Sequence, residues 1–433
     1  MLAAVALLRL VTTHVHMEDY PAQQVPGGAV PIAVASDWAN IVQDAKQCPL
    51  KTKRGVTCTW EHGQRGRHFR FPAGTFTLSQ QVYVPANTIL EGANNPNDVN
   101  DPEKKPQEEE QTFFVVDASA GLRDGRPYCK NVSAATARQL RPGFLLSSST
   151  TVYNINFQGA DVRRGSDNGD LCGGGVFETP GCVRGEDCEA STGDGKAVHN
   201  VHIQNVRLND LHYDEDQFRA SPTTMPASQV ALWVPTTKDG TQSENITVTG
   251  LVSMYTHADG INFHGGSSSR VENSFIARTG DDIFAVWNSE GKDIEYTNCT
   301  GLCPGCAMGL GVNGFSWCIA SYGFQSVSFT DITCLDRTAP LGPKGNGSDP
   351  PLRWSGSMMA RINYLFTSSV STGHGEFTAS GWKWLDMDSK VPIKDFRPLC
   401  AHSANFKDDD MPIFSGVNCS GSFQGNYEGI RRV

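Results

Sequence analysis

The chain has 433 residues, 19% of them charged, and its formal net charge at pH 7 is -10. No Lys/Arg cluster is dense enough to follow a phosphate backbone, so the composition excludes nucleic acid as a partner. The acidic balance also disfavours a polyanionic ligand, because anionic groups are usually bound by Lys and Arg.

The first part of the chain has the character of a targeting segment. Residues 1–8 are apolar until Arg9 interrupts the run, and residues 1–20 together have the pattern of an imperfect signal peptide. No stretch of the sequence is long and apolar enough to span a bilayer. We therefore expect a secreted, extracellular protein that does not enter a membrane.

Residues 30–433 contain no long Pro/Ser-rich linker and are expected to form a single domain. A short helix expected at 37–46 would cap its N-terminal end, and residues from about 375 to 433 would cap its C-terminal end. Residues 71–93 alternate short apolar stretches with Gly, Pro and Asn, which predicts consecutive β-strands joined by tight turns. The acidic, Pro-rich interval 94–111 is expected to be a polar surface loop.

From residue 151 onward, a small or polar residue and an Asn repeatedly precede an alternating apolar strand. The repeated units are TVYNINFQGA, AVHNVHIQNVRLND, SENITVTGLVSMYTHADGINFHG, SSRVENSFIARTGDDIFAVWN, KDIEYTNCTGL and QSVSFTDITCL. A spacing of about 22 to 30 residues suits a solenoid in which every turn contributes two or three short strands. A β-sandwich would give similar local signals.

The register between two units favours the solenoid. An offset of 22 residues sets THADGINF, at 256–263, beneath RTGDDIFA, at 278–285. This alignment stacks Asp259 with Asp281, Ile261 with Ile283, and Phe263 with Ala285. Stacked apolar residues fill the core of a coil, so we predict an all-β fold, a right-handed parallel β-helix.

Thirteen cysteines are more than a reduced intracellular enzyme of this size usually carries. Close pairs such as Cys182/Cys188 and Cys303/Cys306 indicate disulfides in an oxidising compartment, and the odd total leaves at least one thiol unpaired. Zinc is the rival interpretation of the Cys-Pro-Gly-Cys segment, but no second CxxC or HxxxH stands at zinc spacing. We therefore expect no metal and no cofactor. Five sequons are compatible with glycosylation in a eukaryotic secretory pathway: Asn131, Asn245, Asn298, Asn346 and Asn418.

Asp259, Asp281 and Asp282 are the candidate catalytic carboxylates. Neighbouring layers of a coil lie roughly 4.8 Å apart, so acids that are distant in sequence become a cluster. Adjacent strand residues point to opposite faces, and we expect a bulge or turn at Gly280 to direct both members of the Asp-Asp pair outward. Clustered carboxylates repel one another, which leaves one protonated while its neighbours stay ionised. Glycoside hydrolysis needs that division of labour.

Two of these motifs carry a family resemblance. ADGINFHGG at 258–266 and TGDDIFAVW at 279–287, with GGGVFETPG at 173–181 and ALWVP at 231–235, resemble the glycoside hydrolase family of α-1,3-glucanases (mutanases) and mycodextranases, within the pectin-lyase-like β-helix group. The likeness covers about residues 173–331. It implies an inverting reaction that depends on three Asp residues in the first two motifs.

The resemblance also implies roles for the three acids. Asp281 would be the general acid, and Asp259 with Asp282 would orient and activate water. An inverting site predicts carboxyl groups about 6.5 to 9.5 Å apart. The chain departs from the related polygalacturonases, because CPGCAMGLGVNG stands where they have Gly-His-Gly, and the nearest echo of their uronate-binding Arg-Ile-Lys is Arg361-Ile362-Asn363. A neutral α-glucan, in the first place α-1,3-glucan, is therefore the expected substrate.

Six further residues are candidates for contact with the sugar: Trp233, Trp287, His257, His264, Glu178 and Gln229. The two tryptophans could stack on sugar rings, and packing explains them equally well. The two histidines could bind hydroxyls or tune an acid, although a structural role is at least as compatible with the sequence. The Glu and the Gln could line the cleft from earlier layers.

Three alternatives to a glucanase stay open. The first is a polygalacturonase-like pectin hydrolase. The second is a pectate-type lyase, which needs calcium and a basic residue, for which the sequence offers Arg270 and Arg278 beside the acids. The third is a non-catalytic β-helix that binds glycans. In each case the expected partner is a polysaccharide, and we expect the protein to be a monomer.

Overall fold

The computed structural model describes most of the chain between residues 59 and 336 and short strands outside that part. The described residues are 15–16, 59–60, 64–65, 67–71, 73–98, 101–107, 109–117, 119–120, 140–162, 164, 174–182, 191–192, 195–220, 225–287, 292–306, 317–322, 326–336, 358–363, 376–380, 383–386 and 413–414.

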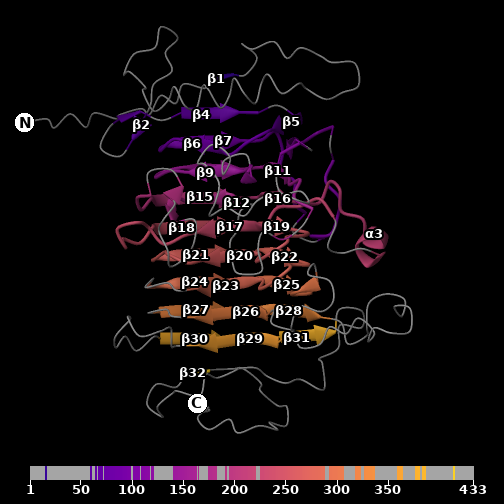
Figure 1. Ribbon diagram of the computed structural model, residues 1–433, viewed down its shortest axis with the longest axis vertical. Coiled ribbons are helices and arrows are strands. Elements are labelled where there is room, and N and C mark those ends of the chain that lie inside the picture. Colours follow the sequence, from indigo (N-terminus) through magenta and orange to yellow (C-terminus); the bar gives the residue numbers. More distant parts are fainter. Residues whose placement is uncertain are drawn as a thin grey trace, which may run out of the picture.

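These residues form three long parallel sheets (Figure 1). Sheet 1 contains β1 (Val15–His16), β4 (Arg67–Arg70), β7 (Thr88–Glu91), β10 (Thr151–Tyr153), β15 (His199–Gln204), β18 (Glu244–Thr249), β21 (Ser269–Glu272), β24 (Ile294–Thr297), β27 (Ser326–Thr330), β30 (Glu376–Ser380) and β32 (Ile413–Phe414). Sheet 2 contains β5 (Gly74–Leu78), β8 (Thr112–Val116), β11 (Ile155–Gln158), β16 (Arg207–Leu208), β19 (Val252–Ser253), β22 (Phe275–Ala277), β25 (Thr300–Leu302), β28 (Thr333–Asp336) and β31 (Lys383–Asp386). Sheet 3 contains β6 (Val82–Val84), β9 (Phe144–Leu146), β12 (Gly175–Glu178), β17 (Val230–Val234), β20 (Ile261–Phe263), β23 (Phe284–Trp287), β26 (Trp317–Tyr322) and β29 (Met358–Asn363).

The chain visits the three sheets in rotation. From β4 to β31 each strand of sheet 1 is followed by one of sheet 2 and one of sheet 3, apart from the antiparallel pair β13 (Gly181–Cys182) and β14 (Ser191–Thr192). A second small pair joins β2 (Thr59–Trp60) to β3 (Gln64–Arg65). Helix is nearly absent from the described residues, where α3 (Glu215–Ala220) projects from the side of the stacked layers (Figure 1). The fold is therefore nearly all-β.

The core runs along the interior between the three sheets. In one layer it receives Ile246 and Val248 from β18, Leu251 from the turn, and Ile261 and Phe263 from β20, all with 0% exposure. Each strand alternates these inward apolar residues with outward ones, as the burial pattern of β18 shows. Burying a side chain of this size contributes roughly 1.5 to 3 kcal/mol, and the layers repeat that contribution along the stack.

The turn from sheet 1 to sheet 2, which we call corner 1–2, is nearly identical in every layer. A single residue with positive φ separates the two strands. The residues at this position are Asn154, Asn205, Gly250, Asn273, Asn298 and Asp331, with φ values of 57°, 49°, 66°, 50°, 50° and 54°. Asn, Asp and Gly are the residues that tolerate the left-handed region best, which explains the Asn before each repeated strand in the sequence.

The turn from sheet 2 to sheet 3, which we call corner 2–3, differs from layer to layer. It spans residues 254–260 between β19 and β20, and 278–283 between β22 and β23. Between β16 and β17 it is much longer, spanning residues 209–229, and contains α3. These insertions explain why the offset between paired strands is 23 residues for Ile261 and Phe284 but 62 for Ile89 and Thr151.

The predicted register is wrong by one residue. Ile261 pairs with Phe284 and Phe263 with Val286, so the offset is 23 residues and not 22. Asp259 therefore lies over Asp282. The prediction aligned like letters, whereas the backbone aligns positions by their distance from the strand, and corner 2–3 uses one residue more than that match allowed.

Several predictions fall wholly or partly outside the described residues. The targeting segment, the helix at 37–46, Cys188 and the sequons at Asn131, Asn346 and Asn418 lie outside them, and the expected C-terminal cap is described only at its three short strands. The interval 94–111 is a mostly exposed loop, as expected, and Asn97 ties it to sheet 2 by donating to the Val206 and Gly250 carbonyls at 3.0 and 2.6 Å.

The cysteines confirm the disulfide interpretation where they are described. Cys303 pairs with Cys306, which replaces the zinc interpretation, and Cys318 pairs with Cys334. Cys299 is a free, buried thiol. Among the described helices, none has the length and apolar character that a membrane span needs.

Candidate active site

Asp259, Asp281 and Asp282 meet at corner 2–3 of two adjacent layers. Asp259 lies just before β20, and the Asp-Asp pair lies just before β23, the next strand of sheet 3. One carboxylate oxygen from each residue can be chosen so that all three lie within 4.8 Å of one another. The sequence-predicted cluster is therefore present in the structure.

Main-chain hydrogen bonds hold the two layers together at this point. The Gly260 N–H donates to the Asp282 carbonyl at 2.8 Å, and the N–H groups of Gly280 and Asp281 both donate to the Ala258 carbonyl, at 3.0 and 3.2 Å. A Cβ added to Gly280 would lie 1.9 Å from the His257 carbonyl oxygen. Glycine is therefore required before the Asp-Asp pair because the two backbones approach closely there.

Asp259 is the carboxyl group that holds a proton most readily. Its side chain accepts hydrogen bonds from the Asn262 amide and, at 3.1 Å, from the Asp282 N–H. Burial and the neighbouring Asp281 charge raise its pKa to about 7, against the opposing effect of Arg164 and the two donors. Near neutral pH, Asp259 is therefore divided between its acid and its base forms.

Asp281 is the most exposed of the three and is paired with a cation. Its Oδ2 accepts from Arg164 Nη2 at 2.7 Å, and its side chain is 24% exposed. Burial acts to lower the pKa of Arg164, but Asp281, Asp259 and Asp282 together outweigh it and raise the pKa above its ordinary value. Arg164 therefore stays charged and favours the ionised form of Asp281.

Asp282 faces inward, contrary to the expectation that a bulge turns both members of the pair outward. It is 1% exposed. It reaches the cluster because its layer lies directly above Asp259 and its N–H bonds to that carboxylate. The alternation of strand residues thus persists up to the pair, and Asp281 alone takes the outward position.

The spacing of the carboxylates is narrower than the sequence-based expectation. An inverting site predicts carboxyl groups about 6.5 to 9.5 Å apart, with room for water between them. Here, the nearest oxygens lie within 4.8 Å. The structure therefore shows a compact cluster in which the acids interact strongly.

Arg164 is delivered by a loop that Asp161 anchors. Asp161 exchanges two main-chain hydrogen bonds with Ala227, at 2.8 and 2.9 Å, and its Oδ2 accepts from Gln229 Nε2 at 3.0 Å. His257 Nε2 lies 2.8 Å from the Asp161 carbonyl oxygen, and burial lowers the pKa of this histidine to about 4. His257 is therefore neutral and donates to that carbonyl.

The structure gives Gln229 and His257 supporting positions, because both are at most 2% exposed and hold the Arg164 loop. Trp233 is also 2% exposed, and its ring centroid lies 4.3 Å from that of His264. Burial lowers the pKa of His264 to about 3, so this imidazole is neutral. Trp287 belongs to β23, and its side chain lies outside the described residues.

Glu178 lies on the same outward row of sheet 3 as Trp233 and Asn262. It is 0% exposed and forms an ion pair with Arg141, while Gln81 Nε2 donates to its Oε2 at 3.0 Å. A buried carboxylate with these partners is satisfied in place. Glu178 therefore stabilises the earlier layers in this structure.

Sequence reasoning missed Arg164, Asp161 and Asn262. Arg270 and Arg278 were the expected basic residues, but Arg270 pairs with Glu272 and Glu295 on sheet 1, and Arg278 pairs with Glu103 and Glu215. The available signal for Arg164 was an Arg-Arg pair a few residues after a sheet 2 strand, at the corner where the acids also lie. Asn262 stands inside the first acidic motif and could have been found there.

Within the described part of the chain, the three acids are also the group whose spacing could hold a metal ion. The Arg164 guanidinium already supplies positive charge beside them. A cation would have to share the cluster with it.

Comparisons with known proteins give distant likenesses. No protein-family model matches the chain, and no curated protein matches it. Its structure is similar to the catalytic domain of GH87 alpha-1,3-glucanase in complex with nigerose, at 14% identity and a TM-score of 0.40, covering 88% of this chain and 55% of that one. It is similar to the Streptococcus pneumoniae surface protein and adhesin PfbA at 12% identity and a TM-score of 0.41, covering 95% of this chain and 99% of that one. The chain spans only about 55% of the length of that glucanase structure, and these scores support a distant relationship at most.

Proposed function

We propose that this protein is a glycoside hydrolase that cleaves a neutral α-glucan, with α-1,3-glucan as the expected substrate and Asp259, Asp281 and Asp282 as its catalytic carboxylates. One observation carries the proposal. Three carboxylates lie within 4.8 Å of one another, the pKa of one is raised to about 7, and an arginine holds another in its ionised form. Titratable groups whose environments separate their pKa values are the parts that acid–base cleavage of a glycosidic bond requires.

The same proposal includes the architecture around the site. The rotation of the chain through three parallel sheets is what a right-handed parallel β-helix produces, and we assign residues 30–433 to one such domain with capped ends. Disulfides favour an oxidising, extracellular setting. We expect the protein to be secreted and monomeric.

The electrostatics favour a different division of roles from the one implied by the family resemblance. Asp259 holds the proton near neutral pH and donates it to the glycosidic oxygen. Asp281, kept ionised by Arg164, accepts a proton from the attacking water, and Asp282 orients Asp259 through its N–H. Inversion of the anomeric centre stays part of the proposal. It requires Asp281 to move away from the cluster as the sugar enters, because the present spacing is too narrow for both groups to flank the bond.

The cation beside the cluster supports a neutral substrate. Arg164 is already paired with Asp281, so its charge is committed to the acids and not offered to a uronate. A polygalacturonase-like hydrolase would need a further cation in the groove.

A pectate-type lyase is the second candidate, because Arg164 is a basic residue next to carboxylates. Such a lyase abstracts a proton with its basic residue. Here, the three acids raise the pKa of Arg164, which makes proton abstraction by this group less favourable. We therefore favour hydrolysis.

Purified protein incubated with α-1,3-glucan, mixed α-glucan, dextran and polygalacturonate tests the proposal. We expect reducing sugars from α-1,3-glucan, no unsaturated product and no loss of activity with a chelator. NMR of the first product gives its anomeric form, and retention would remove inversion while leaving hydrolysis in place. Release of oligogalacturonides, with no cleavage of any neutral glucan, would overturn the substrate. Glycan binding without cleavage of any polymer would favour the non-catalytic alternative.

A further inference from the structure

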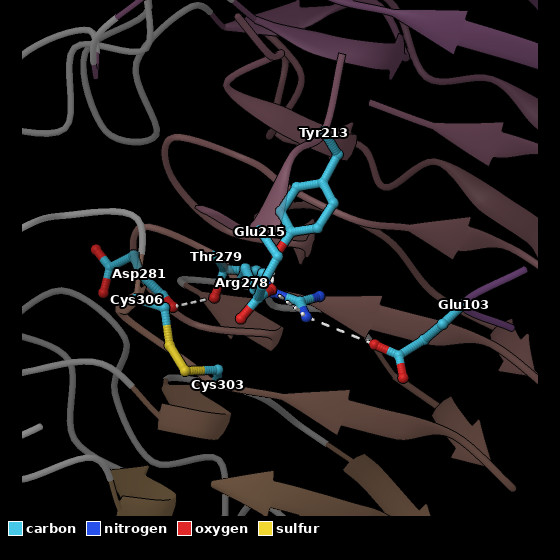
Figure 2. Close-up of a disulfide and its surroundings, with 8 residues drawn as sticks. All are labelled: Glu103, Tyr213, Glu215, Arg278, Thr279, Asp281, Cys303 and Cys306. Atoms are coloured by element: carbon cyan, nitrogen blue, oxygen red, sulfur yellow. Dashed lines mark hydrogen bonds and ion pairs between the residues drawn. A yellow bond between two sulfur atoms is a disulfide. The ribbon is translucent and has the colours of Figure 1, made fainter. Parts of the chain in front are cut away.

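The main chain of Asp281 is held separately from its carboxylate. Its carbonyl oxygen accepts from the Thr279 hydroxyl at 2.6 Å and from the Gly305 N–H at 3.3 Å. Figure 2 shows Asp281 and Thr279 beside the Cys303–Cys306 disulfide, with the Asp281 carboxylate pointing away from the two sulfur atoms. The side chain and the backbone of this residue are therefore held from different sides.

The Gly305 donor belongs to a tightly specified turn. Pro304 and Gly305 occupy the two central positions, and the φ of +73° at Gly305 suits the glycine of a type II turn. The Cys303–Cys306 disulfide joins the first and last residues of the turn. The Cys303 N–H donates to the Leu335 carbonyl at 2.8 Å, which anchors the turn to the next layer.

The segment before Asp281 is fixed at its other end by Arg278. The Arg278 N–H donates to the Leu302 carbonyl at 2.7 Å, and its guanidinium lies 4.6 Å from the Tyr213 ring centroid. Figure 2 shows this side chain reaching away from the disulfide toward Glu103. Residues 278–281 are thus held between a buried cation at one end and the disulfide-closed turn at the other.

We propose that the turn closed by the Cys303–Cys306 disulfide is a positioning element that holds the backbone of Asp281 so that its carboxylate faces the other two acids. This inference rests on the proposed function, since it assigns a reason for the disulfide within the same site. The two cysteines are 3% and 2% exposed, so the bond is shielded from solvent and its role is permanent. Without it, the turn gains conformational freedom, and the Gly305 N–H no longer holds its position.

Two pairs of variants test the proposal. Replacing Cys303 and Cys306 together by Ser removes the bond without leaving a lone thiol, and replacing Cys318 and Cys334 by Ser is the matched control, because that disulfide lies in the core between sheets 2 and 3. We expect the first double variant to lower kcat about tenfold with little change in KM, because a small displacement of a catalytic group is costly. The control should lower the Tm and leave kcat, measured below that Tm, close to wild type.

The Thr279 hydroxyl provides a second test on the same carbonyl. Thr279→Val should lower kcat by a similar factor, and Thr279→Ser, which restores the hydroxyl, should recover it. Because both changes act on one oxygen atom, combining Thr279→Val with the Cys303/Cys306 change should be non-additive. Full additivity, or an equal loss of kcat in the Cys318/Cys334 control, would overturn the proposal.

Amide hydrogen exchange of residues 278–284 separates this inference from the proposed function. The Cys303/Cys306 variant should exchange faster there than wild type, whatever substrate the enzyme accepts. Unchanged exchange would refute the positioning contact even in an active hydrolase. Faster exchange in a protein that cleaves no glycan would refute the hydrolase and keep the structural contact.

Discussion

Corners 1–2 and 2–3 carry opposite kinds of information. Corner 1–2 repeats one device, a single Asn, Asp or Gly with positive φ, from Asn154 to Asp331. Side-chain amides even join the layers there, as Asn298 Nδ2 donates to Asn273 Oδ1 at 2.7 Å. Corner 2–3 repeats nothing of this kind. It holds the acids, the Arg164 loop, α3 and the disulfide-closed turn, each in a different layer.

The difference separates what keeps the layers in register from what performs chemistry. A uniform corner fixes the geometry of each layer, so the opposite corner can vary in length without disturbing the stack. Rigid neighbours on both sides then hold groups delivered by variable loops. The comparison predicts that substitutions at corner 2–3 change activity and that substitutions at corner 1–2 change stability.

Asp259→Asn should have the largest effect on activity. It removes the group that carries the proton near neutral pH, so kcat should fall by about 10³-fold, within the range typical for a general acid. The purified variant should remain folded, and the measurement is the initial rate on α-1,3-glucan.

Asp331→Asn is its matched control at corner 1–2. The same chemical change there affects an exposed turn residue, and Asn accommodates its φ of 54°. The control should keep wild-type kcat. Equal activity in Asp259→Asn and wild type would remove Asp259 from the mechanism and break the contrast between the corners.

The pH dependence of stability should also report on Asp259. Its pKa is raised from 3.8 to about 7 in the folded protein, so between these values the folded state binds more protons than the unfolded state. Stability therefore falls as pH rises from about 4 to 7, by at most about 4 kcal/mol from this group. Denaturant unfolding at several pH values should show this slope in wild type and a flatter one in Asp259→Asn. An identical slope in both proteins would show that another group is responsible.

Arg164→Gln should have the next largest effect. Loss of the cation removes an interaction that lowers the pKa of Asp259 and stabilises ionised Asp281. Both limbs of the pH profile of kcat/KM should therefore move to higher pH, and activity at pH 5 should fall about tenfold. Arg164→Lys should shift the profile less. Arg270→Gln, an exposed residue of sheet 1, is the control and should leave the profile unchanged.

Sequence reasoning recovered the parts that repeat and missed the parts that do not. The Asn before each strand and the alternating apolar residues predicted stacked strands, and the two acidic motifs predicted the cluster. The register was missed by one residue, because letters alone do not show how many residues corner 2–3 uses between Asp259 and Asp282. Arg164 was missed because its partner, Asp281, lies 117 residues away and a loop of variable length brings them together. Its ion pair is a product of the folded layers and has no local sequence pattern.

Asn298→Ala should have the smallest effect and should act on stability alone. Asn298 has a φ of 50°, and a residue with a Cβ and no polar side chain costs roughly 1 to 2 kcal/mol in that region. The substitution also removes the hydrogen bond to Asn273. Asn298→Gly keeps the backbone relaxed and loses that bond alone, so comparing the two variants by urea unfolding separates the contributions. Because Asn298 lies in a sequon, both proteins should be made without glycosylation. Neither variant should change kcat at a temperature where it is folded, and a loss of kcat in the Ala variant alone would show that strain at corner 1–2 reaches the acids across the layer.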